Sequence, residues 1–180
     1  MATVQAGLEV ANPQAYREKL FTLLGDRKPL EVLAHTASTL AAIVRQNTAK
    51  VLRTRPFAGK WTPNEIIGHL VDSEWVYGYR LRLILCEDHP IILGMNQDLW
   101  VAGQRYDERE PAELVDTFRT MRQFNLAVWH RLSPAELQRA GQHNERGPES
   151  LDMTLRMLAG HDLSHLDQIT RYISAVRQRE

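Results

Sequence analysis

The stretch Gly160–Ile169 reads GHDLSHLDQI and lies in the last long helix that the sequence predicts. Its two histidines, His161 and His165, are four residues apart, which places both side chains on one face of an α-helix. His165 falls on the apolar stripe of this helix and His161 lies at its flank, so both imidazoles are expected to face the interior. Buried imidazoles need polar partners, and either one divalent cation or separate core carbonyls and carboxylates would satisfy them. The stripe recurs at steps of three and four and consists of Leu151, Leu155, Leu158, Ile169, Tyr172 and Val176.

A third histidine, His69, lies two turns inside an earlier predicted helix that runs to about Cys86. The start of that helix is marked by Trp61–Ile66 (WTPNEI), which combines an N-cap threonine, a proline at N1 and a glutamate that completes a capping box. His69 shares a face with Ile66, Ser73 and Val76, and it therefore also borders the core. Three imidazoles can converge inside the protein, and a metal held by three histidines keeps open positions, which is typical of catalytic sites.

Other metal chemistries fit the sequence less well. A zincin motif needs glutamate directly after its first histidine and a further ligand downstream, but Asp162 takes the place of that glutamate and no histidine follows His165. A di-iron bundle needs repeated Glu-x-x-His motifs, which this sequence lacks. The third ligand must therefore come from upstream. The remaining histidines are interpreted as structural or solvated, and they are His35, His89, His130 and His143.

The helix signals along the chain predict an all-α protein. A loose leader and a short helix, capped by Asn12 and ending at Gly25, occupy residues 1–28, and a four-helix bundle occupies residues 29–177. The long helices are expected from Pro29 to about Lys50, from Pro63 to about Cys86, from Pro111 to about Arg131 and from Ser150 to about Arg177. A short helix starts at Ser133. The polar segment 141–149 is expected to be a loop, and the apolar, aromatic connection 87–109 is expected to pack against the bundle.

Composition and charge limit the classes of function that the chain can have. The chain has 180 residues, a net charge of zero and 22 basic residues, so it lacks the basic excess that nucleic-acid binding requires. We expect no membrane span, because no apolar run approaches the ~20 residues that one needs. The N-terminus shows no signal peptide, and the single cysteine, Cys86, cannot form an internal disulfide. These features predict a cytoplasmic protein.

The second and third long helices carry large apolar residues outside a single buried stripe: Trp75, Tyr79, Leu83 and Trp129. A surface of this kind often marks a partner interface, which favours a homodimer. Coverage of these residues by the connection 87–109 is the alternative.

Three motifs together resemble the DinB-like superfamily, and most closely its YfiT-like metal-dependent hydrolases. They are WTPNEIIGHLVDSE at residues 61–74, Asn96-Gln97-Asp98, and GHDLSHL at residues 160–166. The resemblance covers about residues 29–177. It implies a four-helix bundle and one divalent ion per chain, nickel or zinc, held by His69, His161 and His165.

The resemblance also implies chemistry, since several relatives transfer low-molecular-weight thiols. We expect a small-molecule thiol and a small electrophile as partners, with Asp72 and Asp162 orienting ligand imidazoles or taking a proton. Asp98, Trp100 and Tyr106 are expected in the pocket wall. A hydrolase with hydroxide as nucleophile, and a protein that binds a metal or small molecule without turnover, remain alternatives because a fold does not fix a reaction.

Overall fold

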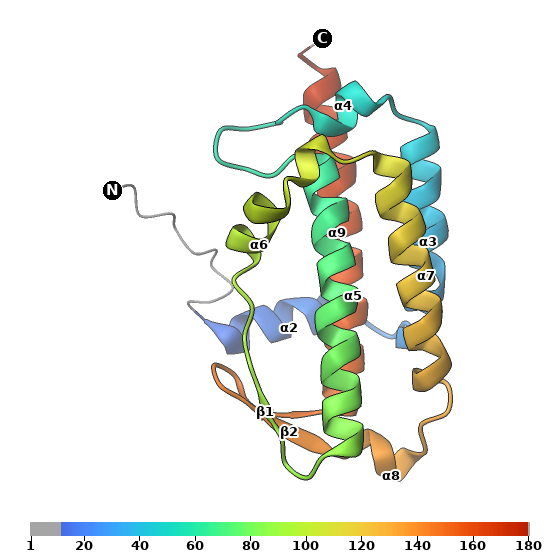
Figure 1. Cartoon of the computed structure of the whole chain (residues 1–180), viewed down its shortest axis with the longest axis vertical. Helices are drawn as coiled ribbons and strands as arrows, with labels where there is room; N and C mark the ends of the chain where they lie inside the picture. The colour runs from blue at the N-terminus through green and yellow to red at the C-terminus, as the bar shows by residue number, and fades with distance from the viewer. Residues whose placement is uncertain (1–11, 180) are drawn as a thin grey trace.

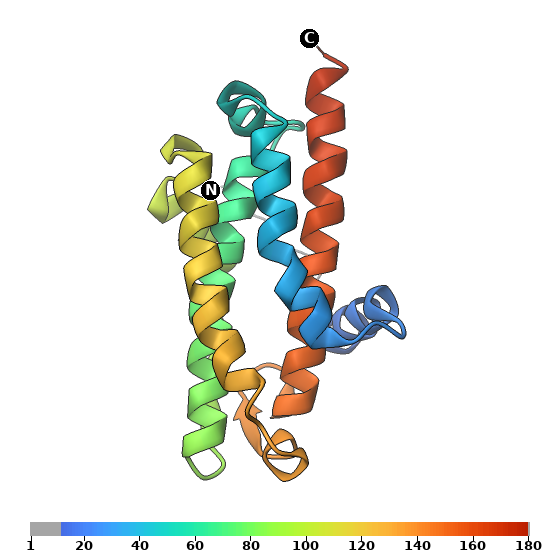
Figure 2. The same cartoon turned by 90° about the vertical axis from the view of Figure 1, so that its right-hand side faces the viewer.

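Four long helices form a bundle in the computed structural model, which describes residues 12–179. They are α3 (Pro29–Arg45), α5 (Pro63–Cys86), α7 (Pro111–Trp129) and α9 (Leu151–Arg177). Helices α3 and α5 each pack against both α7 and α9, so the order around the bundle is α3, α7, α5, α9. Figure 2 shows the four helices running along the long axis of the molecule. The predicted four-helix bundle is confirmed.

The long connection between α5 and α7 follows from the direction of the helices. Helices α5 and α7 are neighbours that run the same way, whereas α3 and α9 run the opposite way (Figure 1). Because the 24 residues of α5 span about 36 Å, the chain must travel that distance back before α7 can begin. It does so along the outside of the bundle, through β1 (Ile91–Ile92), α6 (Gln97–Gln104) and the 3₁₀ turn η1 (Tyr106–Glu108).

Local capping explains why the helices begin where the sequence predicts. The Thr62 hydroxyl accepts from the Glu65 amide at 3.0 Å while the Glu65 carboxylate accepts from the Thr62 amide at 2.6 Å, a complete capping box. Ser133 forms the same box at α8 (Pro134–Leu137), and Asn12 caps α2 (Pro13–Leu24), which packs on α9. Each of these helices has proline at its first position, where its missing N–H costs nothing.

The expected helix from Pro29 to about Lys50 is wrong at its end. Helix α3 stops at Arg45, and Thr48 caps a separate short helix, α4 (Ala49–Arg53), by accepting from the Val51 amide. The side chain of Asn47 bonds to the Ile43 carbonyl and satisfies an acceptor of the last turn of α3. The polar residues Asn47 and Thr48 therefore break one predicted helix into two.

A small sheet closes the end of the bundle where a loop was expected at residues 141–149. Strands β2 (Ala140–His143) and β3 (Gly147–Ser150) form an antiparallel hairpin, and β1 pairs with β2 in parallel, with Ile91 opposite Gln142. Gly141 permits the close approach of β1, since a Cβ at this position would lie 2.9 Å from the Pro90 carbonyl oxygen. The expectation of a loop was wrong, because residues 141–149 pair with each other as a hairpin and also with the distant strand β1.

The exposed aromatic residues agree only partly with the expected partner surface. Trp75 and Tyr79 on α5 are exposed, but Trp129 is 3% exposed and lies in the core, and Leu83 is half-buried against the same core cluster. The inclusion of Trp129 in a partner surface was therefore wrong. No helix within residues 12–179 has both the length and the apolar character to cross a membrane.

Candidate metal centre and its cavity

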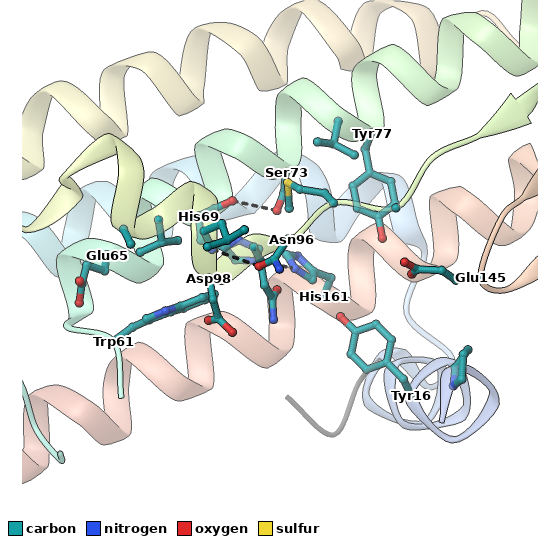
Figure 3. Close-up of a pocket in the computed structure, with 18 of the residues that line it drawn as sticks. Tyr16, Trp61, Glu65, His69, Ser73, Tyr77, Asn96, Asp98, Glu145 and His161 are labelled. Carbon is teal, nitrogen blue, oxygen red and sulfur yellow. Dashed lines mark hydrogen bonds between the residues drawn. The ribbon is translucent and has the colours of Figure 1, made fainter. Parts of the chain in front are cut away.

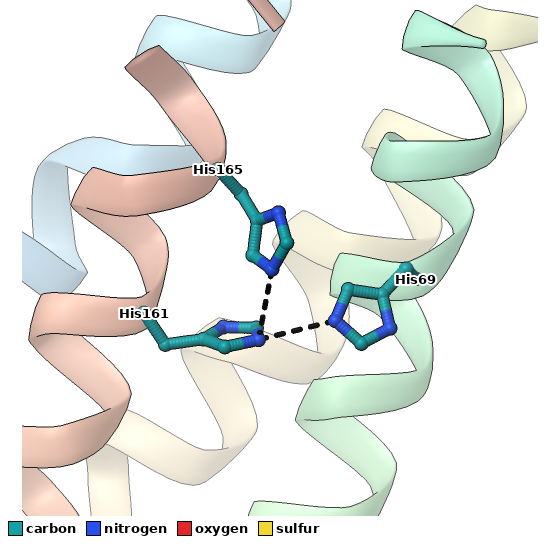
Figure 4. A group of neighbouring side chains, drawn as sticks. All are labelled: His69, His161 and His165. Atoms are coloured by element: carbon teal, nitrogen blue, oxygen red, sulfur yellow. Dashed lines mark hydrogen bonds between the residues drawn. The ribbon is translucent and has the colours of Figure 1, made fainter. Parts of the chain in front are cut away.

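The three histidines converge on one point in the interior (Figure 4). His161 Nε2 lies 3.1 Å from His69 Nε2 and 3.1 Å from His165 Nε2, and each of the three residues is less than 10% exposed. The antiparallel pair α5 and α9 brings them together, with His69 in the second turn of α5 and the other two one turn apart in the middle of α9. The sequence-based expectation that they meet is thus reproduced by the fold.

Burial keeps these imidazoles in the form that binds metal. Desolvation, together with the proximity of His165, lowers the pKa of His69 and of His161 well below the ordinary value. Desolvation also lowers the pKa of His165 to about 4, although a hydrogen bond to Gln168 works against it. The three rings are therefore neutral near pH 7, and each presents a nitrogen lone pair.

The donor set fits a divalent cation. Tetrahedral zinc with Zn–N bonds of about 2.0–2.1 Å separates its nitrogen ligands by about 3.3 Å. This is close to the 3.1 Å from His161 Nε2 to the Nε2 atoms of His69 and His165, and all three ligand atoms lie within 4.8 Å of one another. Neutral imidazoles at this spacing cannot satisfy all three Nε2 atoms by hydrogen bonds to one another. One cation can bind the lone pairs of all three. His165 Nδ1 bonds to Gln168 Oε1 at 2.8 Å, which orients that ring from its far side.

Two glycines next to the histidines set the position of their helices. A Cβ at Gly160 would lie 2.3 Å from the backbone oxygen of Leu20, so α2 crosses α9 in direct backbone contact beside His161. A Cβ at Gly68 would lie 2.2 Å from the Tyr106 ring, which η1 places against α5 beside His69. The fold thus holds both sides of the centre through contacts that a larger residue would disrupt.

A buried polar network that the sequence did not predict lies in the centre of the bundle, adjacent to the histidines. Arg122 of α7 is 2% exposed and donates to Glu74 at 2.8 Å and to Asp162 at 2.7 Å. Thr36 donates to Asp162 at 2.6 Å, and Asn125 donates to Glu74 at 3.0 Å. Burial lowers the pKa of Arg122, but the two carboxylates more than offset this effect and raise it. All four long helices contribute to this network.

The two aspartates expected to act on the ligand imidazoles are held elsewhere. Asp162 bonds to Thr36 and Arg122 through Oδ2, and its Oδ1 has no partner among the described residues. Asp72 accepts from the Tyr106 hydroxyl and from Gln104, both at 2.7 Å, and burial raises its pKa. The expected contact of either carboxylate with a ligand ring is therefore not formed within residues 12–179. Their hydrogen bonds instead support the helices that carry His69 and His161.

A cavity of about 770 Å³ opens onto the histidine cluster. His69 and His161 line it, and Trp61 lies against His69 with ring centroids 5.0 Å apart. Figure 3 shows Trp61, Asn96 and Asp98 at the histidine end, and Tyr16, Tyr77 and Glu145 toward the other end. The walls come from α5, α9, α2, the α5–α7 connection and the β2–β3 hairpin.

The three residues expected in the pocket wall have different places. Asp98, half-buried in the first turn of α6, lines the cavity. Trp100 is 42% exposed and lies outside the cavity lining. Tyr106 is 3% exposed and packs behind the wall against Gly68.

Sequence reasoning missed the far end of the cavity. Arg80 and Tyr77 on α5 and Arg146 on the hairpin line it there. A signal for Arg80 was present, because it continues the face of His69, Ser73 and Val76 by a step of four. A charged residue on a buried face is itself a sign of function.

Comparison with known proteins identifies the family. The sequence profile of the DinB superfamily matches residues 32–169, which include all three histidines. The chain belongs to the DinB superfamily. A protein of Oceanobacillus iheyensis, named as a candidate metal-dependent hydrolase, is 29% identical over 114 residues, and the match covers 63% of this chain and 65% of that protein.

Another relative and a solved structure agree with this assignment. A protein of Bacillus mycoides, with the same description, is 26% identical over 156 residues, covering 84% of this chain and 85% of its own length. YfiT from Bacillus subtilis, described as a candidate metal-dependent hydrolase with an unusual four-helix bundle topology, superposes with a TM-score of 0.73 at 21% identity. The superposition covers 81% of this chain and 86% of YfiT, and it shows that this DinB-superfamily chain has the YfiT-like bundle.

Proposed function

We propose that this protein is a cytoplasmic, metal-dependent enzyme that transfers a low-molecular-weight thiol onto a small electrophile. One observation carries the proposal: three neutral imidazoles converge at the wall of a cavity of about 770 Å³, large enough for a small molecule. The metal we propose is one nickel or zinc ion per chain on His69, His161 and His165.

Three neutral ligands suit an enzyme. A divalent cation on three imidazoles keeps its full charge and lowers the pKa of a bound thiol or water toward neutrality. Because a free thiol has a pKa near ~8.5, most of it is protonated at pH 7 without such help. His69 and His161 supply their lone pairs at the cavity wall, whereas His165 lies behind them and takes its orientation from Gln168.

The protein residues around the cavity position the reactants and limit water. The Trp61 ring covers His69 from the side of the cavity. Ser73 donates to the His69 carbonyl at 2.9 Å, and the Ser73 hydroxyl oxygen remains at the cavity wall. Asn96 and Asp98 on the α5–α7 connection offer polar groups to the electrophile. Asp98 lies toward the histidine end of the cavity in Figure 3, and we propose it as the group that takes the thiol proton.

A hydrolase is the second candidate. The relatives named as candidate metal-dependent hydrolases favour it, and the same cavity would then bind an ester or amide with water in place of the thiol. A protein that binds a metal or a small molecule without turnover is the third. The open cavity at the histidines supports the enzyme over the third candidate, since closed coordination is typical of structural sites.

A single assay separates the three. The zinc and nickel forms are offered a panel of thiols with a chromogenic electrophile, and ester and amide substrates without thiol. We expect conjugation that depends on both metal and thiol and is absent from His161→Ala. Hydrolysis without thiol would support the hydrolase instead, and no rate above the His161→Ala background would support binding without turnover.

A further inference from the structure

The end of the cavity away from the histidines contains a buried cation, Arg80. It lines the cavity, yet it is only 4% exposed. Burying a charged side chain is strongly unfavourable unless charged or polar partners compensate it. The partners that Arg80 has are therefore informative.

Within residues 12–179, Arg80 makes one hydrogen bond, from Nη2 to the Leu93 carbonyl at 2.9 Å. Its guanidinium lies over the Tyr77 ring, 5.3 Å from the centroid. Its Nε is buried without a partner. No guanidinium nitrogen of Arg80 lies within 4.0 Å of a carboxylate oxygen among the described residues, although Glu145 and Glu149 are close enough to act on its charge. Its Nη1 makes no hydrogen bond to the described residues either, so the two N–H groups of Nη1 remain for a ligand in the cavity that Arg80 lines.

The neighbouring charges limit what that ligand can be. Glu149 is already held by Arg146, which donates to both of its carboxylate oxygens. Arg80 and Arg146 face two carboxylates, Glu145 and Glu149, so this end of the cavity has no net charge to neutralise a dianion. A single carboxylate matches the planar guanidinium and adds less negative charge than a phosphate dianion.

The position of Arg80 relative to the histidines sets the length of the ligand. The Tyr77 ring lies between them, 6.3 Å from the His161 ring and 5.3 Å from the Arg80 guanidinium. The eleven residues from His69 to Arg80 rise about 16 Å along α5. A ligand that touches both ends must therefore carry its two functional groups several bonds apart. The Tyr77 ring forms the cavity wall between these two groups.

We propose that Arg80 binds the carboxylate of a small molecule whose other end reaches the three histidines. This inference rests on the proposed function for the identity of that other end, a thiol. The substrate class is then a thiol with a remote carboxylate. Binding of the carboxylate by Arg80 fixes the position of the ligand along α5 and places its thiol at the histidine end of the cavity.

Calorimetric titration tests the carboxylate, and cobalt absorption tests the thiol separately. The cobalt-loaded protein and its Arg80→Gln variant are titrated with 6-mercaptohexanoate, its methyl ester and hexanoate, and the thiolate band is recorded. We expect the wild type to bind the acid about tenfold or more tighter than the ester, as for one charged hydrogen bond, and Arg80→Gln to lose this preference. Arg82→Gln, on the same helix but outside the cavity, should keep it.

Each result has one meaning for Arg80. Equal affinity for acid and ester, or a preference that survives in Arg80→Gln, overturns the carboxylate site, and the second result would point to chelation by the metal. Tighter binding of 6-mercaptohexyl phosphate than of the acid also overturns it. An acid preference that depends on Arg80 but shows no thiolate band supports the carboxylate site and contradicts the proposed thiol chemistry. Unchanged cobalt content in Arg80→Gln shows that the variant is folded around its metal.

Discussion

Arg122 and Asp162 form an ion pair in the centre of the bundle, with Nη1 2.7 Å from Oδ2 and both side chains 2% exposed or less. Asp162 follows His161 on α9, so this pair ties the ligand helix to α7. Arg122 also pairs with Glu74, which makes it the counter-charge of two buried carboxylates.

Replacement of Arg122 should therefore lower the stability of the protein strongly. Arg122→Leu leaves Glu74 and Asp162 buried without a cation, and we expect the free energy of unfolding to fall by about 3–5 kcal/mol. Arg119→Leu, one turn earlier on α7 and paired with Asp116 at the surface, should change it by about 0.5 kcal/mol or less. Chemical denaturation measures both, and equal losses would show that burial of the network is unimportant.

Loss of the capping box at the start of α5 should lower the stability of the protein by a smaller amount. Thr62→Ala removes the hydroxyl that accepts from the Glu65 amide, and we expect a loss of about 0.5–2 kcal/mol of stability and weaker metal binding, since His69 lies two turns inside this helix. Thr39→Ala, at an exposed position inside α3, is the matched control and should leave stability unchanged or slightly higher. A denaturation midpoint that moves equally in both variants would rule out the cap as the cause.

These cases also show which features the sequence can reveal. Helix starts were predictable because Asn12, Thr62 and Ser133 cap amides only a few residues away, so the signal is local. The convergence of the three histidines was predictable because each lies on a buried face of its own helix. The network around Arg122 was not predictable, since its partners Glu74 and Asp162 are 48 and 40 residues distant in the sequence.

The hairpin was missed because its own sequence carries a weak strand signal. Strand β3 reads Gly-Pro-Glu-Ser and β2 reads Ala-Gly-Gln-His, which have low strand propensity. Strand β2 also pairs with β1, about 50 residues earlier, at the tight approach of Gly141. Pro148 is tolerated because β3 is an edge strand.

His143 on β2 makes stability depend on pH. It is 1% exposed, and burial together with Arg146 lowers its pKa to about 4. Because the unfolded chain has a pKa near ~6.5, the unfolded state binds more protons between these values, and the stability from the neutral ring is full above about pH 6.5 and lost as pH falls toward 4. We expect the difference in unfolding free energy between wild type and His143→Gln to shrink over this range. A constant difference from pH 7 to pH 4.5 would contradict this account.

The exposed aromatic residues of α5 and α7 lead us to propose a homodimer. Trp75, Tyr79 and Phe124 are 66%, 64% and 67% exposed, and Arg82 lies over the Phe124 ring between the two helices. Light scattering at micromolar concentration should give twice 20.7 kDa, and Trp75→Glu should shift the mass to the monomer. Leu99→Glu, equally exposed on α6, should not. A monomeric wild type would refute the proposal.

The central claim is that His69, His161 and His165 hold one divalent cation, and metal analysis of single-histidine variants tests it most directly. We expect about one nickel or zinc ion per chain in the wild type and in His35→Ala, whose histidine lies on the exposed face of α3. His69→Ala, His161→Ala and His165→Ala should each lose most of the metal while circular dichroism shows an intact helical fold. Full metal occupancy in a folded His161→Ala protein would contradict the account, because His161 Nε2 is the atom within 3.1 Å of both other ligands.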